Sequence, residues 1–185
     1  MAIFGELLAT LKDHHGPNTQ FQVIYEDLEM NDFNSLFKRM SGIIPDPPSY
    51  LQEMDNVYVL ASGTNFYKQC VPSNSMHFMM SMTSVHWLSR TATTFKDSIY
   101  KDAKSSTEET AALNKQAELD WEMFLLRRSR ELKRGGLLVV DSRSLEEKEQ
   151  IVDGLYDDVK KRLSRMNPEI FKDDLRFIYL VIRKE

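Results

Sequence analysis

Hydrophobic residues follow two different spacings along the chain, one typical of α-helices and one typical of β-strands. Apolar residues three and four positions apart predict amphipathic helices over residues 1–12, 32–40, 106–132 and 144–166. Short runs rich in β-branched and aromatic residues predict strands over residues 21–25, 57–61, 76–82, 137–140 and 177–182. Because strands and helices are interleaved, the pattern predicts an α/β fold with a sheet of about five strands and helices on both faces.

The run from Met76 to Met82 is apolar on both of its alternating faces. Such a run is typical of a central strand covered on both sides, although its periodicity also fits a buried helix. The pair His86-Trp87 follows at the expected carboxyl end of this strand, the edge at which open α/β sheets bind ligands. Two ring N–H donors there could hold a small anion or carboxylate. A His-Trp pair is more often part of a core, and that interpretation stays open here.

The predicted strand that begins at Phe21 runs into Glu26-Asp27-Leu28, and Asn31 or Asp32 can cap the helix that follows. An acidic residue after such a strand is placed to accept hydrogen bonds from a ribose diol, as in nucleotide-binding α/β folds. A carboxylate that only stabilises a turn is the alternative.

The long helix predicted over residues 106–132 has its own start and stop signals. Ser106 and Glu109 fit a capping box, and Gly135-Gly136 is expected to end the helix as a C-cap. The arginines between residues 127 and 130 are expected on the exposed face. The apolar face is predicted from residues Leu113, Ala117, Trp121, Phe124, Leu125 and Leu132.

Length and composition narrow the class of protein. A chain of 185 residues is expected to form a single domain, residues 1–185, and a net charge of −4 gives no basic surface for nucleic acid. Cys70 is the single cysteine, which excludes a disulfide framework and a cysteine zinc cluster and favours a reducing, cytoplasmic location. No apolar run is long enough for a membrane span, and no metal site is expected.

Two motifs resemble those of a known family. Asn74–Phe78 (NSMHF) and Ser84–Ser89 (SVHWLS) are similar to the signature "NSLHF…SLHWLS" of the SABATH methyltransferases. These enzymes methylate carboxylic acids such as salicylate, jasmonate and indole acetate, or xanthine nitrogens, from S-adenosylmethionine. The resemblance implies a Rossmann-like methyltransferase sheet, S-adenosylmethionine as cofactor and a small-molecule carboxylic acid as substrate.

The same resemblance assigns cofactor-binding residues. Residues 26–34 (EDLEMNDFN) resemble the family's "NDLPGNDFN", which implies that Asp27 holds the cofactor ribose and Leu28 contributes an apolar contact. The end of the second predicted strand resembles the approach to the family's "PGSFY", which places Asn65 on a cofactor-binding serine and Phe66 on the aromatic residue near the adenine. From the residues alone, a ring at the position of Phe66 is more often core.

For the substrate, the resemblance implies that His86 and Trp87 hold the carboxylate. Thr83 stands where many family members have a pocket tyrosine, so a small planar aromatic acid such as salicylate is not the expected substrate. No catalytic acid or base is expected, because the sulfonium methyl group is already activated.

Two pieces of the family pattern are not found in the chain. One is the segment with the first, central strand and the loop "DLGCSSG", and the other is most of the helical cap over the pocket. The fold is therefore expected to be incomplete, with a sheet broken at its centre. Two functions follow as alternatives: a carboxyl methyltransferase or part of one, either monomeric or a homodimer, and a non-catalytic homologue that binds a ligand or a protein.

Overall fold

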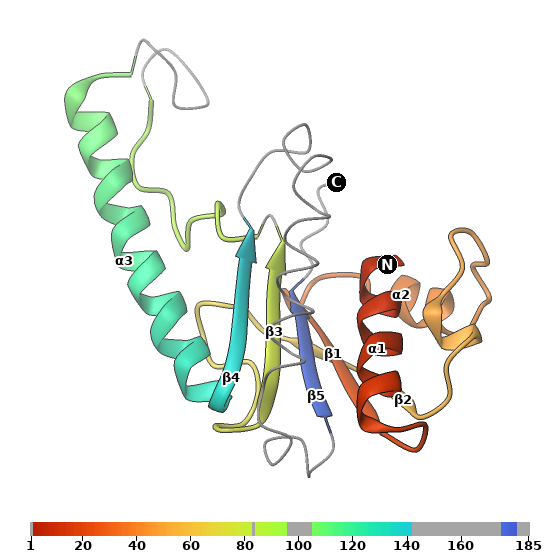
Figure 1. Cartoon of the computed structure of the whole chain (residues 1–185). Coiled ribbons are helices and arrows are strands. Elements are labelled where there is room, and N and C mark those ends of the chain that lie inside the picture. The colour runs from red at the N-terminus through yellow and green to blue at the C-terminus, as the bar shows by residue number, and fades with distance from the viewer. Residues whose placement is uncertain (1, 83, 96–104, 142–174, 181–185) are drawn as a thin grey trace.

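One parallel sheet forms the centre of the molecule (Figure 1). The computed structural model describes residues 2–82, 84–95, 105–141 and 175–180. All five strands predicted from the sequence are confirmed, in the order β2-β1-β5-β3-β4. They are β1 (Phe21–Asp27), β2 (Val57–Gly63), β3 (Met76–Met82), β4 (Leu132–Asp141) and β5 (Leu175–Leu180). The predicted α/β class is confirmed.

Helices cover both faces of this sheet, as predicted. They are α1 (Ala2–His15), α2 (Phe33–Met40), the short 3₁₀ helix η1 (Tyr50–Gln52) and α3 (Thr107–Glu131). Leu7, Leu8 and Leu11 of α1 pack with Phe78 of β3 in one buried cluster, whereas Met79 packs with Phe124 of α3 in a second cluster. Because side chains alternate along a strand, α1 and α3 lie on opposite faces.

The centre of the sheet differs from the expectation of a break. β5 pairs in parallel with β1 on one side, where Val23 is opposite Phe177, and with β3 on the other, where Phe78 is opposite the same residue. The backbone groups of both neighbouring strands are therefore paired across the centre. The spacing of apolar residues predicts that a strand exists but not which neighbours it takes.

The start of α3 agrees with the prediction, but its buried face does not. Ser106 accepts from the Glu109 amide and Glu109 accepts from the Ser106 amide, which confirms the capping box. Trp121 and Leu125 of the predicted apolar face are 45% and 38% exposed. The buried face instead carries Gln116, Asp120, Phe124, Arg128 and Glu131. Hydrogen bonds and an ion pair hold this face where apolar packing was expected.

The Gly135-Gly136 pair has a different role from the predicted C-cap. The helix ends at Glu131, and the two glycines lie inside β4. The register between β3 and β4 shifts there, with Met76 opposite Leu132 but Phe78 opposite Leu137. Gly135 has φ +83°, which a residue with a side chain adopts at a cost, so the glycine pair suits the irregular stretch where the register shifts.

Other predictions fall partly outside the described ranges. The predicted helix over residues 144–166 lies wholly outside them.

The cap of α2 is also settled. Asp32, one of the two residues predicted to cap this helix, is its N-cap and accepts from the Ser35 amide. No helix in the ranges that the structure describes is long and apolar enough to cross a bilayer.

Candidate ligand site at the carboxyl edge of the sheet

Three separate parts of the chain meet where β1, β2 and β3 end. Because all three strands run in the same direction, their carboxyl ends lie at one edge of the sheet (Figure 1). The Thr64 amide donates to the Asp27 carbonyl at 2.9 Å, which joins the end of β1 to the segment after β2. Tyr67 Oη then donates to the Trp87 carbonyl at 2.6 Å, which joins that segment to the turn after β3. This edge therefore brings together the end of β1 at Asp27, the segment after β2 and the turn that carries Trp87.

Asp27 is the last residue of β1 and is almost fully buried. One carboxylate oxygen accepts from the Leu28 amide at 2.7 Å, and the other accepts from the side-chain amide of Asn31. Burial raises the pKa of Asp27, and these two hydrogen bonds oppose the rise. Each carboxylate oxygen can accept two hydrogen bonds and receives one of these two. Leu28 beside it is 45% exposed.

The segment after β2 holds the two other residues assigned to the cofactor. Asn65 Oδ1 accepts from the Tyr67 amide at 2.9 Å, which fixes the turn at the start of the segment. The Phe66 ring is 4% exposed and lies edge-on to Phe124 of α3, with 6.0 Å between ring centroids. In this arrangement Phe66 packs in the core, and its contact with an adenine stays a prediction.

The two residues assigned to the substrate lie in the turn after β3. The Trp87 amide donates to the Ser84 carbonyl at 3.1 Å, and the rings of His86 and Trp87 are 5.3 Å apart. The Trp87 side chain is 48% exposed, so a ligand can reach its ring. Thr83, the third predicted substrate residue, lies outside the described residues.

The same turn is anchored on the polar face of α3. Ser89 donates to Asp120 from both its amide and its hydroxyl, at 2.8 Å and 2.6 Å. Arg90 Nε donates to Gln116 Oε1 at 2.7 Å, and Gln116 in turn donates to Asp120. These contacts explain why α3 buries polar residues: the helix orients the turn that carries Trp87.

A buried ion pair fixes the segment after β2. Arg128 and Glu131 have fully buried side chains, and Arg128 Nε lies 2.7 Å from Glu131 Oε2. Arg128 also donates to the carbonyls of Phe66 and Lys68 at 2.9 Å each, while Glu131 accepts from the Cys70 amide. The expectation that Arg128 lies on the exposed face is wrong. It follows Phe124 by four residues, the spacing that puts both on one helix face.

Glu26 is a second buried acid under this segment. Its side chain is 1% exposed, and neither carboxylate oxygen forms a hydrogen bond within ordinary geometry. Burial raises the pKa of Glu26 to about 8, while the nearby Arg128 charge acts in the opposite direction. The Cys70 thiol beside it has a pKa raised to about 12, chiefly by burial, so Cys70 is an unreactive thiol at neutral pH.

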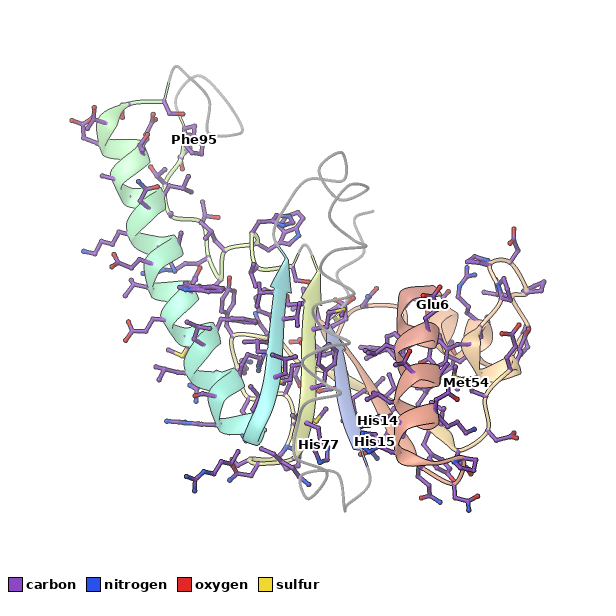
Figure 2. The ribbon with its side chains drawn as sticks, in the orientation of Figure 1. Glu6, His14, His15, Met54, His77 and Phe95 are labelled. Atoms are coloured by element: carbon purple, nitrogen blue, oxygen red, sulfur yellow. The ribbon has the colours of Figure 1, made fainter. Side chains whose placement is uncertain are left out.

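Histidines elsewhere do not contribute to this edge. Figure 2 places His77 near the amino end of β3, and His14 and His15 at the end of α1 on the same side of the molecule. Within the described ranges, no three side chains of the metal-binding types form a group that could hold an ion. The absence of a metal site stays a prediction.

The site residues that the sequence did not indicate are Tyr67, Asp120, Arg128 and Glu131. The last three lie with Phe124 at helical spacing on one face of α3. That spacing was a usable signal, but polar side chains at such positions are usually exposed. Nothing in the sequence around Tyr67 indicates its bond to Trp87. The two residues are twenty positions apart and come together only because β2 and β3 end at the same edge of the sheet.

The fold and this edge define a class of protein: a parallel α/β protein with an acid at the end of one strand and a His-Trp pair in the turn after another. The family model described as SAM dependent carboxyl methyltransferase matches residues 2–174, and the chain belongs to this family.

Individual relatives agree with this family. The chain is 32% identical over 133 residues to a Petunia hybrida S-adenosyl-L-methionine:benzoic acid/salicylic acid carboxyl methyltransferase, covering 70% of this chain and 37% of that protein. It is 31% identical over 140 residues to a probable jasmonic acid carboxyl methyltransferase of Theobroma cacao, covering 67% and 36%. It is 32% identical over 143 residues to rice indole-3-acetate O-methyltransferase 1, covering 64% and 34%. The match thus spans about a third of each relative's length.

A solved structure also resembles this one. Loganic acid methyltransferase with SAH aligns over 86% of this chain and 64% of that chain, with 18% identity and a TM-score of 0.48.

Proposed function

We propose that this chain binds S-adenosylmethionine and a small-molecule carboxylic acid at the carboxyl edge of its sheet, as part of a carboxyl methyltransferase. The observation that carries the proposal is the placement of the segment after β2: its Thr64 amide donates to the Asp27 carbonyl, and its Tyr67 hydroxyl donates to the Trp87 carbonyl. It joins the residue assigned to the cofactor ribose with the residue assigned to the substrate carboxylate.

The residues fit the cofactor in part. Asp27 keeps one acceptor position on each oxygen, which suits the two hydroxyls of a ribose, and the exposed Leu28 can cover an apolar face of the ligand. The buried ring of Phe66 packs beneath the segment after β2, so in this arrangement it offers no exposed face to an adenine.

When bound, S-adenosylmethionine would supply an activated methyl group for transfer to a carboxylate oxygen, with S-adenosylhomocysteine as the leaving group. An ionised carboxylate needs no base, so the protein's task is orientation in a site that excludes water. The Trp87 ring N–H, and that of His86, would hold one carboxylate oxygen so that the other faces the methyl group. Asp27 would fix the cofactor ribose.

The other parts of the proposal concern the setting of the site. We propose a single domain over residues 1–185 that acts in the cytoplasm without nucleic acid or membrane. Thr83 in the place of a pocket tyrosine favours an acid larger or less planar than salicylate. A homodimer remains the alternative to a monomer.

Calorimetric titration with S-adenosylhomocysteine tests the cofactor site, with Asp27→Asn as the variant. Its amide keeps the shape of the side chain but loses the charge, and a hydrogen bond to a charged group contributes about 1.5–3 kcal/mol, so affinity should fall about tenfold or more. Glu29→Gln is the matched control, because Glu29 is an exposed acid in the same loop. Equal affinities of both variants and the wild type would assign Asp27 to the turn alone. Failure of the wild type to bind would favour the non-catalytic alternative.

A further inference from the structure

Tyr67 connects the two halves of the candidate site. Its backbone amide donates to Asn65 Oδ1 at 2.9 Å, and its hydroxyl donates to the Trp87 carbonyl at 2.6 Å. Asn65 is assigned to the cofactor and Trp87 to the substrate. One residue is therefore bonded to a predicted contact of each ligand.

The backbone on both sides of Tyr67 is held in place. Arg128 donates to the carbonyls of Phe66 and Lys68, the two neighbours of Tyr67 in the chain, at 2.9 Å each. The Tyr67 ring also packs against the Phe66 ring, with 4.4 Å between centroids. Because the Arg128 side chain is fully buried and paired with Glu131, these contacts give Tyr67 a rigid support. A displacement of the segment after β2 would therefore also displace the Trp87 backbone through the Tyr67 hydrogen bond.

The chemistry of Tyr67 suits a lasting hydrogen-bond donor. Burial, and next the charge of Asp120, raise the pKa of Tyr67 to about 12, so the phenol keeps its proton at neutral pH. The distance of 2.6 Å to the Trp87 carbonyl lies in the range of a good O–H···O bond. Asp120 also holds Ser89, so the turn after β3 is fixed at both Trp87 and Ser89.

On the basis of the proposed function, we propose that Tyr67 is a positioning residue that couples the cofactor and substrate sites through its hydrogen bond to the Trp87 carbonyl. A ligand that shifts the segment around Asn65 then also shifts the backbone that aims the Trp87 ring. Coupling between two binding sites is reciprocal, so each ligand should tighten the binding of the other. A residue that only filled the core would produce no such coupling.

The test compares the wild-type chain with Tyr67→Phe, which keeps the ring and removes the hydroxyl. Tyr58→Phe is the matched control, because Tyr58 is a 54% exposed tyrosine on β2. The first readout is amide hydrogen exchange of residues 84–88 without ligand. The second is the calorimetric affinity for S-adenosylhomocysteine, alone and with saturating jasmonate as the carboxylate probe.

We expect faster exchange of residues 84–88 in Tyr67→Phe only. In the wild type the carboxylate probe should tighten S-adenosylhomocysteine about fivefold or more, and in Tyr67→Phe this factor should fall toward one, while affinity for S-adenosylhomocysteine alone changes less than about twofold. Unchanged exchange, or equal coupling in all three chains, would overturn the proposal. A wild type that binds no S-adenosylhomocysteine would refute the proposed function and the coupling together. Exchange would still show whether Tyr67 holds the turn.

Discussion

Replacing Glu26 with glutamine should make the protein more stable at alkaline pH. Glu26 is 1% exposed and its pKa is raised to about 8 from an ordinary value of 4.5, chiefly by burial. The folded state therefore holds a proton that the unfolded chain releases between these two pH values. A state that binds more protons loses stability as pH rises, so the free energy of unfolding should fall from about pH 4.5 to about pH 8 and then level off.

The size of the effect follows from the same shift. One pKa unit corresponds to about 1.4 kcal/mol, so the whole shift amounts to at most about 5 kcal/mol. Most of this lies below pH 7, and about 2 kcal/mol remains between pH 6 and pH 8. Glutamine resembles the protonated acid in shape and charge, so Glu26→Gln should not show this part of the pH dependence.

Urea unfolding at pH 6, 7, 8 and 9 measures this difference. The free energy of unfolding of Glu26→Gln minus that of the wild type should increase by about 2 kcal/mol from pH 6 to pH 8. Glu29→Gln, a change of an exposed acid three residues away, should give a difference that does not vary with pH. Parallel pH profiles of Glu26→Gln and the wild type would refute the assignment of a protonated acid beneath the segment after β2.

Three substitutions test the elements that support the site, each by urea unfolding at neutral pH. Arg128→Met leaves Glu131 buried without its partner and should cost about 3–5 kcal/mol, whereas Arg130→Met on the exposed face should cost under about 0.5 kcal/mol; equal costs would contradict the buried pair. Gly135→Ala places a side chain at φ +83° and should cost about 1–2 kcal/mol, and no loss would argue against this backbone conformation. Ser106→Ala removes the capping box and should cost about 1 kcal/mol, which a value near zero would contradict.

Periodicity predicted the existence of the elements well, because each strand and helix carries its own spacing. It could not predict that β5 pairs with both β1 and β3, since pairing depends on contacts between residues far apart in the chain. The Gly135-Gly136 pair shows a related difficulty. Two glycines after a helical pattern fit a C-cap as well as a bulge, and only the register with β3 separates the two.

The sequence predicted candidate site residues where a residue type and a strand end coincide, as at Asp27 and Trp87, and their roles stay predictions. It was not predictable for Arg128, because an arginine on a helix is usually exposed and becomes buried only when its five donors find partners. Here those partners are Glu131 and the carbonyls of Phe66 and Lys68, which lie about sixty residues earlier in the chain. The spacing of residues along the helix does not identify the two carbonyl partners, which belong to a distant part of the chain.

Transfer of a labelled methyl group measures the proposed carboxyl methyltransferase activity itself. The chain is incubated with methyl-labelled S-adenosylmethionine and a panel of carboxylic acids, and labelled esters are extracted and counted. We expect ester formation by the wild type. Trp87→Phe should lose about 10- to 100-fold in rate at unchanged affinity for S-adenosylhomocysteine, because a hydrogen bond to a charged group contributes about 1.5–3 kcal/mol. Equal ester formation by Trp87→Phe, or no ester from the wild type with any acid of the panel, would contradict it.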